Sequence, residues 1–262
     1  MADVGSVISS KNGPCAWLTF SNPKRLNAVS LRMWQAAETA LGALGEDEEV
    51  RILVVTGAGE RAFVAGSDMS RFESERSTKA EIHEYNETIE RVFTRLAKFP
   101  APTIAMIRGH CIGAGLHLAL ACDIRICSDR ATFAMPAAAR GLALSYDALK
   151  RMVASIGPTS AKEICFTAQR FDASAARSYG VVGQVMPHDD LTPYVNQLTD
   201  QIARNAPLVL KAMKHIIAQT ASDGVHDRMA CDSMVDRCFD SNDYIEGRRA
   251  AAEKRPPQFT GT

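Results

Sequence analysis

Residues 109–126 read GHCIGAGLHLALACDIRI, a stretch that predicts a short helix between two β-strands. Its start is rich in glycine and other small residues, and the segment from Gly113 to Cys122 is otherwise nearly all apolar. A helix that is apolar all round is buried in a core. Glycine permits the tight turn and close backbone approach that such a helix start needs. We therefore predict a buried helix over residues 113–122.

Short apolar runs on both sides of this helix predict buried strands, because they end at glycines or turn residues. These runs are 16–20, 51–56, 103–107 and 124–127. From Ser30, a plausible N-cap, apolar residues recur at helical spacing at positions 31, 34, 41 and 44. Strands separated by helices indicate the α/β class, although the order is not a regular βαβ alternation. From about Ser145 the chain is predicted to be mainly helical, including a segment over 225–239 with Met229, Met234 and Val235 on it.

Composition excludes several classes of protein. The 262 residues carry 30 basic and 30 acidic side chains, so there is no positive excess for nucleic acid to bind. The first five residues do not resemble a signal peptide, and no apolar run reaches the ~20 residues of a membrane span. Seven scattered cysteines, without a C-x-x-C pair, indicate neither a disulfide framework nor a zinc site. We expect a cytoplasmic protein with reduced thiols and no metal.

Four segments, in this order, resemble the enoyl-CoA hydratase/isomerase (crotonase) superfamily. Residues 22–28, NPKRLNA, are similar to its N-x-P-x-x-x-N-A loop. Residues 56–69 resemble its T-G-x-G…F-x-A-G-x-D loop, and 109–126 resemble G-x-x-x-G-G-G…A-C-D-x-R-I. The tail 246–259 resembles E-G-x-x-A-x-x-E-K-R-x-P-x-F. The resemblance covers nearly the whole chain, and four segments in order make chance an unlikely explanation.

The resemblance implies a spiral of ββα units over residues 1–190 and a helical region for oligomerisation over residues 191–262. It implies homotrimers, or hexamers built as dimers of trimers. Acyl-CoA thioesters are the implied substrates, as in fatty acid metabolism. Coenzyme A is then part of the substrate, and neither a separate cofactor nor a metal is implied.

The resemblance also implies that two backbone N–H groups hold the thioester oxygen as it becomes an enolate. By position these belong to Ser67 and Ala114. Gly66 permits the sharp turn before Ser67. The first N–H groups of a helix lack intrahelical partners and favour negative charge. Because the family usually has glycine at the position of Ala114, we expect the donor to be kept, provided that the backbone is right-handed there.

Coenzyme A contacts are implied for a further set of residues near these loops. Lys24 and Arg25 lie where the family meets the pantetheine and phosphates, although solvated surface residues are an equal alternative. The rest of the set is Ala28, Ala65, Asp68 and Gly113.

The chain departs from a standard hydratase at both of its catalytic glutamates. At the two corresponding positions, this chain has His117 and Ala137. A methyl group transfers no proton, so the two-glutamate mechanism is not available. His117 is the best candidate for the acid/base, because the pKa of histidine, ~6.5, suits proton transfer near neutrality; a buried structural histidine is the alternative. Tyr146 is a candidate to orient a substrate or act as an acid, or else a surface residue at a helix start.

The leading hypothesis is a lyase or isomerase that acts through an enolate, with His117 as the base. A non-catalytic acyl-CoA binding protein is the first alternative, because missing carboxylates fit it equally well. A thioester hydrolase or decarboxylase is the second. The sequence decides neither the acyl group, which depends on a roof helix over residues 72–85, nor trimer against hexamer.

Overall fold

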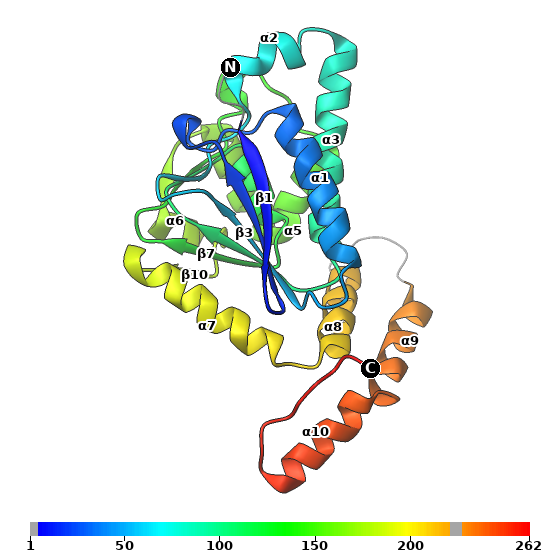
Figure 1. Ribbon diagram of the computed structural model, residues 1–262. Coiled ribbons are helices and arrows are strands. Elements are labelled where there is room, and N and C mark those ends of the chain that lie inside the picture. Colours follow the sequence, from blue (N-terminus) through cyan, green and yellow to red (C-terminus); the bar gives the residue numbers. More distant parts are fainter. Residues whose placement is uncertain (1–4, 221–226) are drawn as a thin grey trace.

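The computed structural model describes residues 5–220 and 227–262, and its chain winds between two β-sheets (Figure 1). The larger sheet has the order β1-β2-β3-β5-β7-β10, and only β1 is antiparallel to its neighbour. Its strands are β1 (Ser6–Asn12), β2 (Cys15–Ser21), β3 (Ile52–Gly57), β5 (Thr103–Ile107), β7 (Ile124–Ser128) and β10 (Gln184–Met186). The smaller sheet consists of β4 (Ala62–Val64), β6 (His110–Ile112), β8 (Thr132–Ala134) and β9 (Phe171–Asp172).

The chain alternates between the two sheets three times. β3 leads to β4, β5 to β6 and β7 to β8, and each second strand is followed by a helical segment. These ββα units confirm the predicted fold class. The helices of the units are α2 (Phe72–Glu75) and α3 (Lys79–Ala97), then α4 (Ala114–Leu120), then α5 (Tyr146–Thr167).

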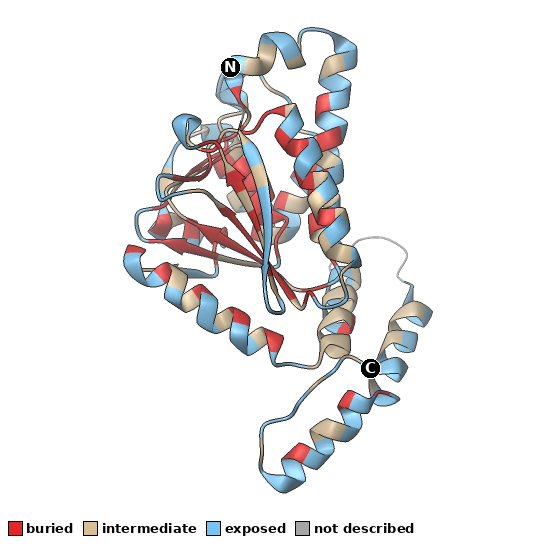
Figure 2. Ribbon diagram, viewed as in Figure 1, coloured by how far each residue is buried: buried red, intermediate tan, exposed pale blue. Residues whose placement is uncertain are grey.

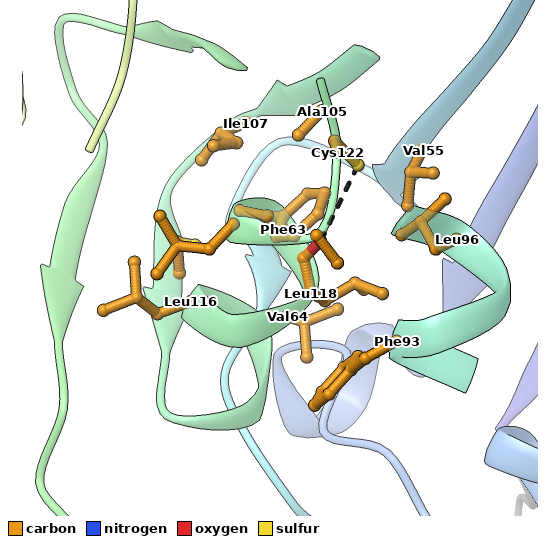
Figure 3. Close-up of a cluster of buried hydrophobic side chains, with 14 of the residues drawn as sticks. Val55, Phe63, Val64, Phe93, Leu96, Ala105, Ile107, Leu116, Leu118 and Cys122 are labelled. Atoms are coloured by element: carbon orange, nitrogen blue, oxygen red, sulfur yellow. Dashed lines mark hydrogen bonds between the residues drawn. The ribbon is translucent and has the colours of Figure 1, made fainter. Parts of the chain in front are cut away.

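Helix α4 lies in the middle of the core. Leu116 and Leu118 are fully buried, and Figure 3 shows them among apolar side chains from both sheets and from α3. At Gly115 the helix touches β4 so closely that a Cβ atom would lie 2.1 Å from the carbonyl oxygen of Val64. Only glycine permits this approach, which fixes the start of α4 against the end of β4.

Further helices cover the outer faces of the sheets. α1 (Leu31–Glu46) packs beside α3, and its N-cap Ser30 accepts a hydrogen bond from the N–H of Met33, as predicted. α7 (Leu191–Ala203) packs on the larger sheet through Leu191 and Val195. The predicted division at residue 190 therefore assigns α7, which packs on the core, to the C-terminal region. The division into two domains stays a prediction. α6 (Ala173–Ser178) lies beside β9 and β10.

The last three helices project away from the sheets (Figure 1). They are α8 (Pro207–Thr220), α9 (Arg228–Phe239) and α10 (Asn242–Glu253). Lys214 of α8 anchors this region to the core, because its ammonium lies 2.7 Å from the Asp123 carboxylate. Most of α9 and α10 is exposed or half-buried (Figure 2). Val225, the start of the segment predicted over 225–239, lies outside the described residues.

The strands and helices predicted from periodicity between residues 16 and 127 are present within two residues of the expected bounds, and of the segment predicted over 225–239 the structure shows α9, from Arg228 to Phe239. β1 and the short strands β4, β6, β8, β9 and β10 were not predicted; the last five have two or three residues each, too few for an alternating pattern. No helix in residues 5–220 or 227–262 is both long and apolar enough to cross a membrane.

We expect Gly115→Ala to destabilise the fold by about 1–3 kcal/mol or more, because its methyl group collides with backbone that cannot yield. Gly42→Ala is the matched control: it lies inside α1, where a Cβ atom meets nothing closer than 3.7 Å. This control should gain about 0.5–1 kcal/mol. Urea unfolding measures both, and equal stability of the two variants would refute the close contact.

Candidate active site

A cavity of about 310 Å³ lies where the three ββα units meet. It is bounded by the loop after β4, the first turn of α4, and the segment between β8 and α5. Phe72, Arg76 and one face of α3 form its roof. A larger cavity, of about 600 Å³, lies among α8, α9 and α10, but its lining is almost entirely apolar. The smaller cavity is the candidate active site, because polar groups converge on it.

The loop over residues 22–28 is tied to the loop that follows β4. The buried Asn27 side-chain amide donates hydrogen bonds to the carbonyls of Ala58 and Ala62, at 2.9 and 2.7 Å. Its side-chain oxygen accepts a bond from the N–H of Asn22. The N–H of Ala65 then donates to the carbonyl of Leu26 at 3.1 Å. Leu26 and Asn27 have φ values of 54° and 56°, a conformation that asparagine tolerates better than most residues.

Two backbone N–H groups, those of Ser67 and Ala114, belong to residues that line the cavity, and neither donates a hydrogen bond within the described chain. Ser67 follows Gly66, whose φ of 102° turns the chain sharply. Val29 holds both neighbours of Ser67: its N–H donates to the carbonyl of Gly66, and its carbonyl accepts from the N–H of Asp68, at 2.9 Å each. Ala114 is the first residue of α4 and has ordinary right-handed geometry, so the condition set for its N–H is met. Gly113, with φ 57°, makes the turn before it.

His117 faces the cavity one turn into α4 and is only 4% exposed. Neither ring nitrogen has a hydrogen-bond partner in the described residues. Burial lowers the pKa of His117 to about 4, with a contribution from the Arg151 cation that the Glu90 carboxylate partly offsets. The imidazole is therefore neutral near pH 7, and it is a weaker base than its ordinary pKa suggests.

A salt bridge lies beside His117 at the roof. Arg151 of α5 donates to both oxygens of Glu90 of α3, at 2.7 and 2.8 Å. The guanidinium also lies over the Phe93 ring, 5.5 Å from its centroid, and the Phe93 and His117 rings are 6.1 Å apart. Glu90, Phe93 and His117 all line the cavity.

The other predicted site residues are spread around the cavity. Ala65 and Gly113 line it. Lys24 and Arg25 are exposed on the 3-10 turn Pro23–Arg25 next to the Ala65 loop, and Ala28 is half-buried there. The buried Asp68 caps the turn Met69–Arg71 through Ser70 and lies 3.5 Å from Arg25, a structural arrangement.

Tyr146 is not brought to the cavity. It is 76% exposed at the first position of α5 and is not among the lining residues. Its neighbour Ser145 does line the cavity, but the Ser145 hydroxyl accepts a hydrogen bond from the N–H of Ala148 as the N-cap of α5. The expected role of Tyr146 at the site therefore has no geometric support.

The face of α3 that lines the cavity was not predicted from the sequence. Asn86, Ile89, Glu90 and Phe93 follow at spacings of three, one and three, so they share one helix face. The predicted roof ended at residue 85, before all four. The available signal was a charged residue, Glu90, between the apolar residues Ile89 and Phe93 of the same helix face. Nowhere in the described chain do three His, Cys, Asp or Glu side chains form a group that could hold a metal ion.

Comparisons with known proteins identify the family of the chain. The model of the family "Enoyl-CoA hydratase/isomerase" matches residues 10–262. The short-chain-enoyl-CoA hydratase of Clostridium acetobutylicum is 31% identical over 97% of both chains. The carnitinyl-CoA dehydratase of Proteus mirabilis is 33% identical over 90% of this chain and 92% of its own. The structure of an enoyl-CoA hydratase/carnithine racemase from Magnetospirillum magneticum has a TM-score of 0.91, with 29% identity, over 100% of this chain and 97% of the other.

The buried His117 predicts how stability depends on pH. Its folded pKa of about 4 is below the ordinary value of 6.5, so the unfolded chain binds the proton more tightly. His117 should therefore reduce the free energy of unfolding as pH falls from about 6.5 to 4, by at most about 3 kcal/mol. His117→Gln should flatten this slope, measured by urea unfolding at several pH values, whereas the exposed His83→Gln should not. Equal slopes for His117→Gln and the unaltered protein would contradict the burial.

Proposed function

The chain belongs to the enoyl-CoA hydratase/isomerase family, and from this we propose that it processes acyl-CoA thioesters through an enolate held by the N–H groups of Ser67 and Ala114. The observation that carries the proposal is this pair of unpaired N–H groups, from two different ββα units, on one cavity. Backbone donors that face developing negative charge are worth ~10²–10³ in rate each in other enzymes.

The proposed chemistry begins with loss of a proton from the carbon next to the thioester carbonyl. The electrons of that C–H bond form a double bond to the carbonyl carbon, and the carbonyl oxygen becomes an anion that accepts hydrogen bonds from Ser67 and Ala114. Return of a proton elsewhere on the acyl chain gives isomerisation, and departure of a β-substituent gives elimination. The protein is then a lyase or an isomerase.

His117 is our candidate acid/base on the floor of the cavity. Its support is its position, one helical turn after Ala114, and its two free ring nitrogens. Its low pKa makes it neutral and able to accept a proton, but only weakly basic. Ala137 lines the same cavity and supplies no proton, so neither glutamate of a standard hydratase has a replacement of equal strength at its own position.

Coenzyme A is proposed to enter past the loop over residues 22–28. The exposed Lys24 and Arg25 are the candidates for its phosphates, and the Ala28 and Ala65 backbone for the pantetheine. Asp68 and Gly113 support this entrance by fixing the loops.

We expect little or no hydration of crotonyl-CoA, because the two carboxylates that activate water are absent. Incubation with crotonyl-CoA and with longer, branched, aromatic and malonyl-type thioesters, followed by mass spectrometry, measures this. Crotonyl-CoA hydration near the usual enzyme median of ~10 s⁻¹ would refute the expectation. Turnover of another thioester would identify the substrate class.

The second candidate function is acyl-CoA binding without catalysis, favoured by the same missing carboxylates. His117→Ala separates the two: a fall of ~10²-fold in turnover identifies an enzyme that uses this residue. Binding of a CoA ester without turnover across the whole panel identifies a binding protein. A thioester hydrolase or decarboxylase would be recognised from its products.

A homotrimer, or a hexamer of two trimers, is our proposal for the assembly. Apolar side chains are exposed around the cavity of α8, α9 and α10; Met213, Phe239 and Tyr244 are 56%, 59% and 41% exposed. Exposed apolar patches of this kind mark interfaces between proteins.

Light scattering should therefore give three or six times the 28.4 kDa of one chain. Phe239→Glu should lower the mass towards one chain, because it places a charge in the apolar patch. Ile8→Glu, at a 50% exposed position on β1, should not. A mass of 28.4 kDa for the unaltered protein would refute the assembly.

A further inference from the structure

We propose that Glu90 is the group that takes the proton from the substrate carbon in this cavity, and that Arg151 is the residue that positions it. The inference rests on the proposed function: it gives the removal of the proton to Glu90 and leaves His117 as the candidate for the return of a proton to the acyl chain. Glu90 occupies neither of the two positions from which a standard hydratase supplies its glutamates.

Glu90 is the one carboxylate among the residues that line the cavity in the described chain. The other charged lining residues are Arg76 and Arg140, which cannot act as bases. His117 is neutral and weakly basic, as its pKa of about 4 shows. The lining therefore offers two proton acceptors, Glu90 and His117, and of these Glu90 is the one whose orientation is fixed by hydrogen bonds within the described residues.

The position of Glu90 follows from its helix. Asn86, Ile89, Glu90 and Phe93 form the face of α3 that lines the cavity, and Phe93 is buried beside His117. Glu90 thus lines the same cavity as Ser67 and Ala114. Enolate formation needs a proton acceptor near the carbon next to the carbonyl and hydrogen-bond donors near the carbonyl oxygen, and residues of both kinds line this cavity.

Arg151 fixes the orientation of this carboxylate. The two parallel hydrogen bonds, 2.7 and 2.8 Å long, hold both oxygens in the plane of the guanidinium. Oε1 also accepts a hydrogen bond from the Thr94 hydroxyl at 3.4 Å, so Oε2 is the oxygen with an acceptor site left for a substrate proton, because each carboxylate oxygen has about two such sites. Arg151 is itself held over Phe93. Its side chain is 18% exposed and that of Glu90 is 26% exposed, so the pair is accessible to a ligand but protected from bulk solvent.

The proposed step is a proton transfer from the substrate carbon to Glu90. A Glu90 oxygen forms an O–H bond with the proton of the carbon next to the carbonyl, and the C–H bond breaks. Its electrons form the enolate double bond, and the negative charge moves from Glu90 to the thioester oxygen, where Ser67 and Ala114 hold it. Return of the same proton, or of a solvent-exchanged one, reverses the step.

A salt bridge of similar chemistry on the surface provides a matched control. Glu38 of α1 lies 2.9 Å from Arg91 of α3 and is 19% exposed, but it does not line the cavity. Glu90→Gln and Glu38→Gln make the same chemical change in the two pairs. Only the first removes the proposed base.

The experiment measures two quantities, with butyryl-CoA and the more acidic phenylacetyl-CoA as probes. Calorimetric titration gives the Kd of each thioester, and mass spectrometry in D₂O gives the rate of deuterium incorporation next to the carbonyl. We expect Glu90→Gln to bind both probes within ~3-fold of the unaltered protein and to exchange at least ~10²-fold more slowly. Glu38→Gln should change neither quantity.

Arg151 is tested by conservative and reversed variants. Arg151→Lys keeps the charge but loses the planar fork, so exchange should fall less than in Arg151→Met, with binding unchanged. The double variant Glu90→Arg/Arg151→Glu keeps a salt bridge between α3 and α5 but moves the carboxylate to the other helix. It should regain the thermal stability lost in Arg151→Met without regaining the exchange rate. A purely structural pair would regain both.

The outcomes separate the two proposals. Normal exchange by Glu90→Gln, or binding without exchange in the unaltered protein, overturns the role of Glu90 and leaves acyl-CoA recognition standing. Absence of binding in the unaltered protein overturns the proposed function itself, and the role of Glu90 falls with it.

Discussion

The close approach of α4 to β4 at Gly115 is the constraint on which the rest of the site depends. A Cβ atom there would lie 2.1 Å from the carbonyl oxygen of Val64, so the helix can occupy this place only without a side chain. The N–H of Gly113 also donates to the carbonyl of Ala134 in β8, at 2.9 Å. The start of α4 is thus held by the second strands of two other ββα units. Because Ser67 follows β4 and Ala114 begins α4, one contact brings both N–H groups to one cavity.

In the proposed chemistry, backbone N–H groups bind the thioester oxygen, whereas side chains transfer the protons. The N–H groups of Ser67 and Ala114 each follow a glycine turn, and Ser67 is also fixed by hydrogen bonds between its two neighbours and Val29. A substitution at position 117 or 137 therefore changes which protons can move without moving the donors. In the proposed chemistry, the chain can therefore keep these loops while it carries histidine at position 117 and alanine at position 137. The same division of roles explains why the loops alone do not decide between hydration, isomerisation and binding.

Features that depend on glycine and on local spacing were predictable from the sequence, and features that depend on packing were not. The glycine-rich loops and the buried helix α4 were predicted because the chain conformation there leaves few other residues possible. Tyr146 was assigned by its neighbourhood in the sequence, but the first turn of α5 directs it to solvent. The ordinary pKa of histidine supported His117 as a base, yet burial lowers that pKa to about 4. Glu90 was missed because its partner, Arg151, is 61 residues away in the sequence.

The location of the carboxylate on the roof has a consequence for how this fold can change its reaction. Residue 117 lies on the buried helix α4, where His117 is 4% exposed, so a charge placed there must be accommodated in the core. α3 contributes to the same cavity, and the guanidinium of Arg151 neutralises the charge of Glu90. A carboxylate on α3 thus avoids most of the free-energy cost of burying an isolated charge. The roof helix can therefore carry an acid/base at a lower cost in stability than position 117 can.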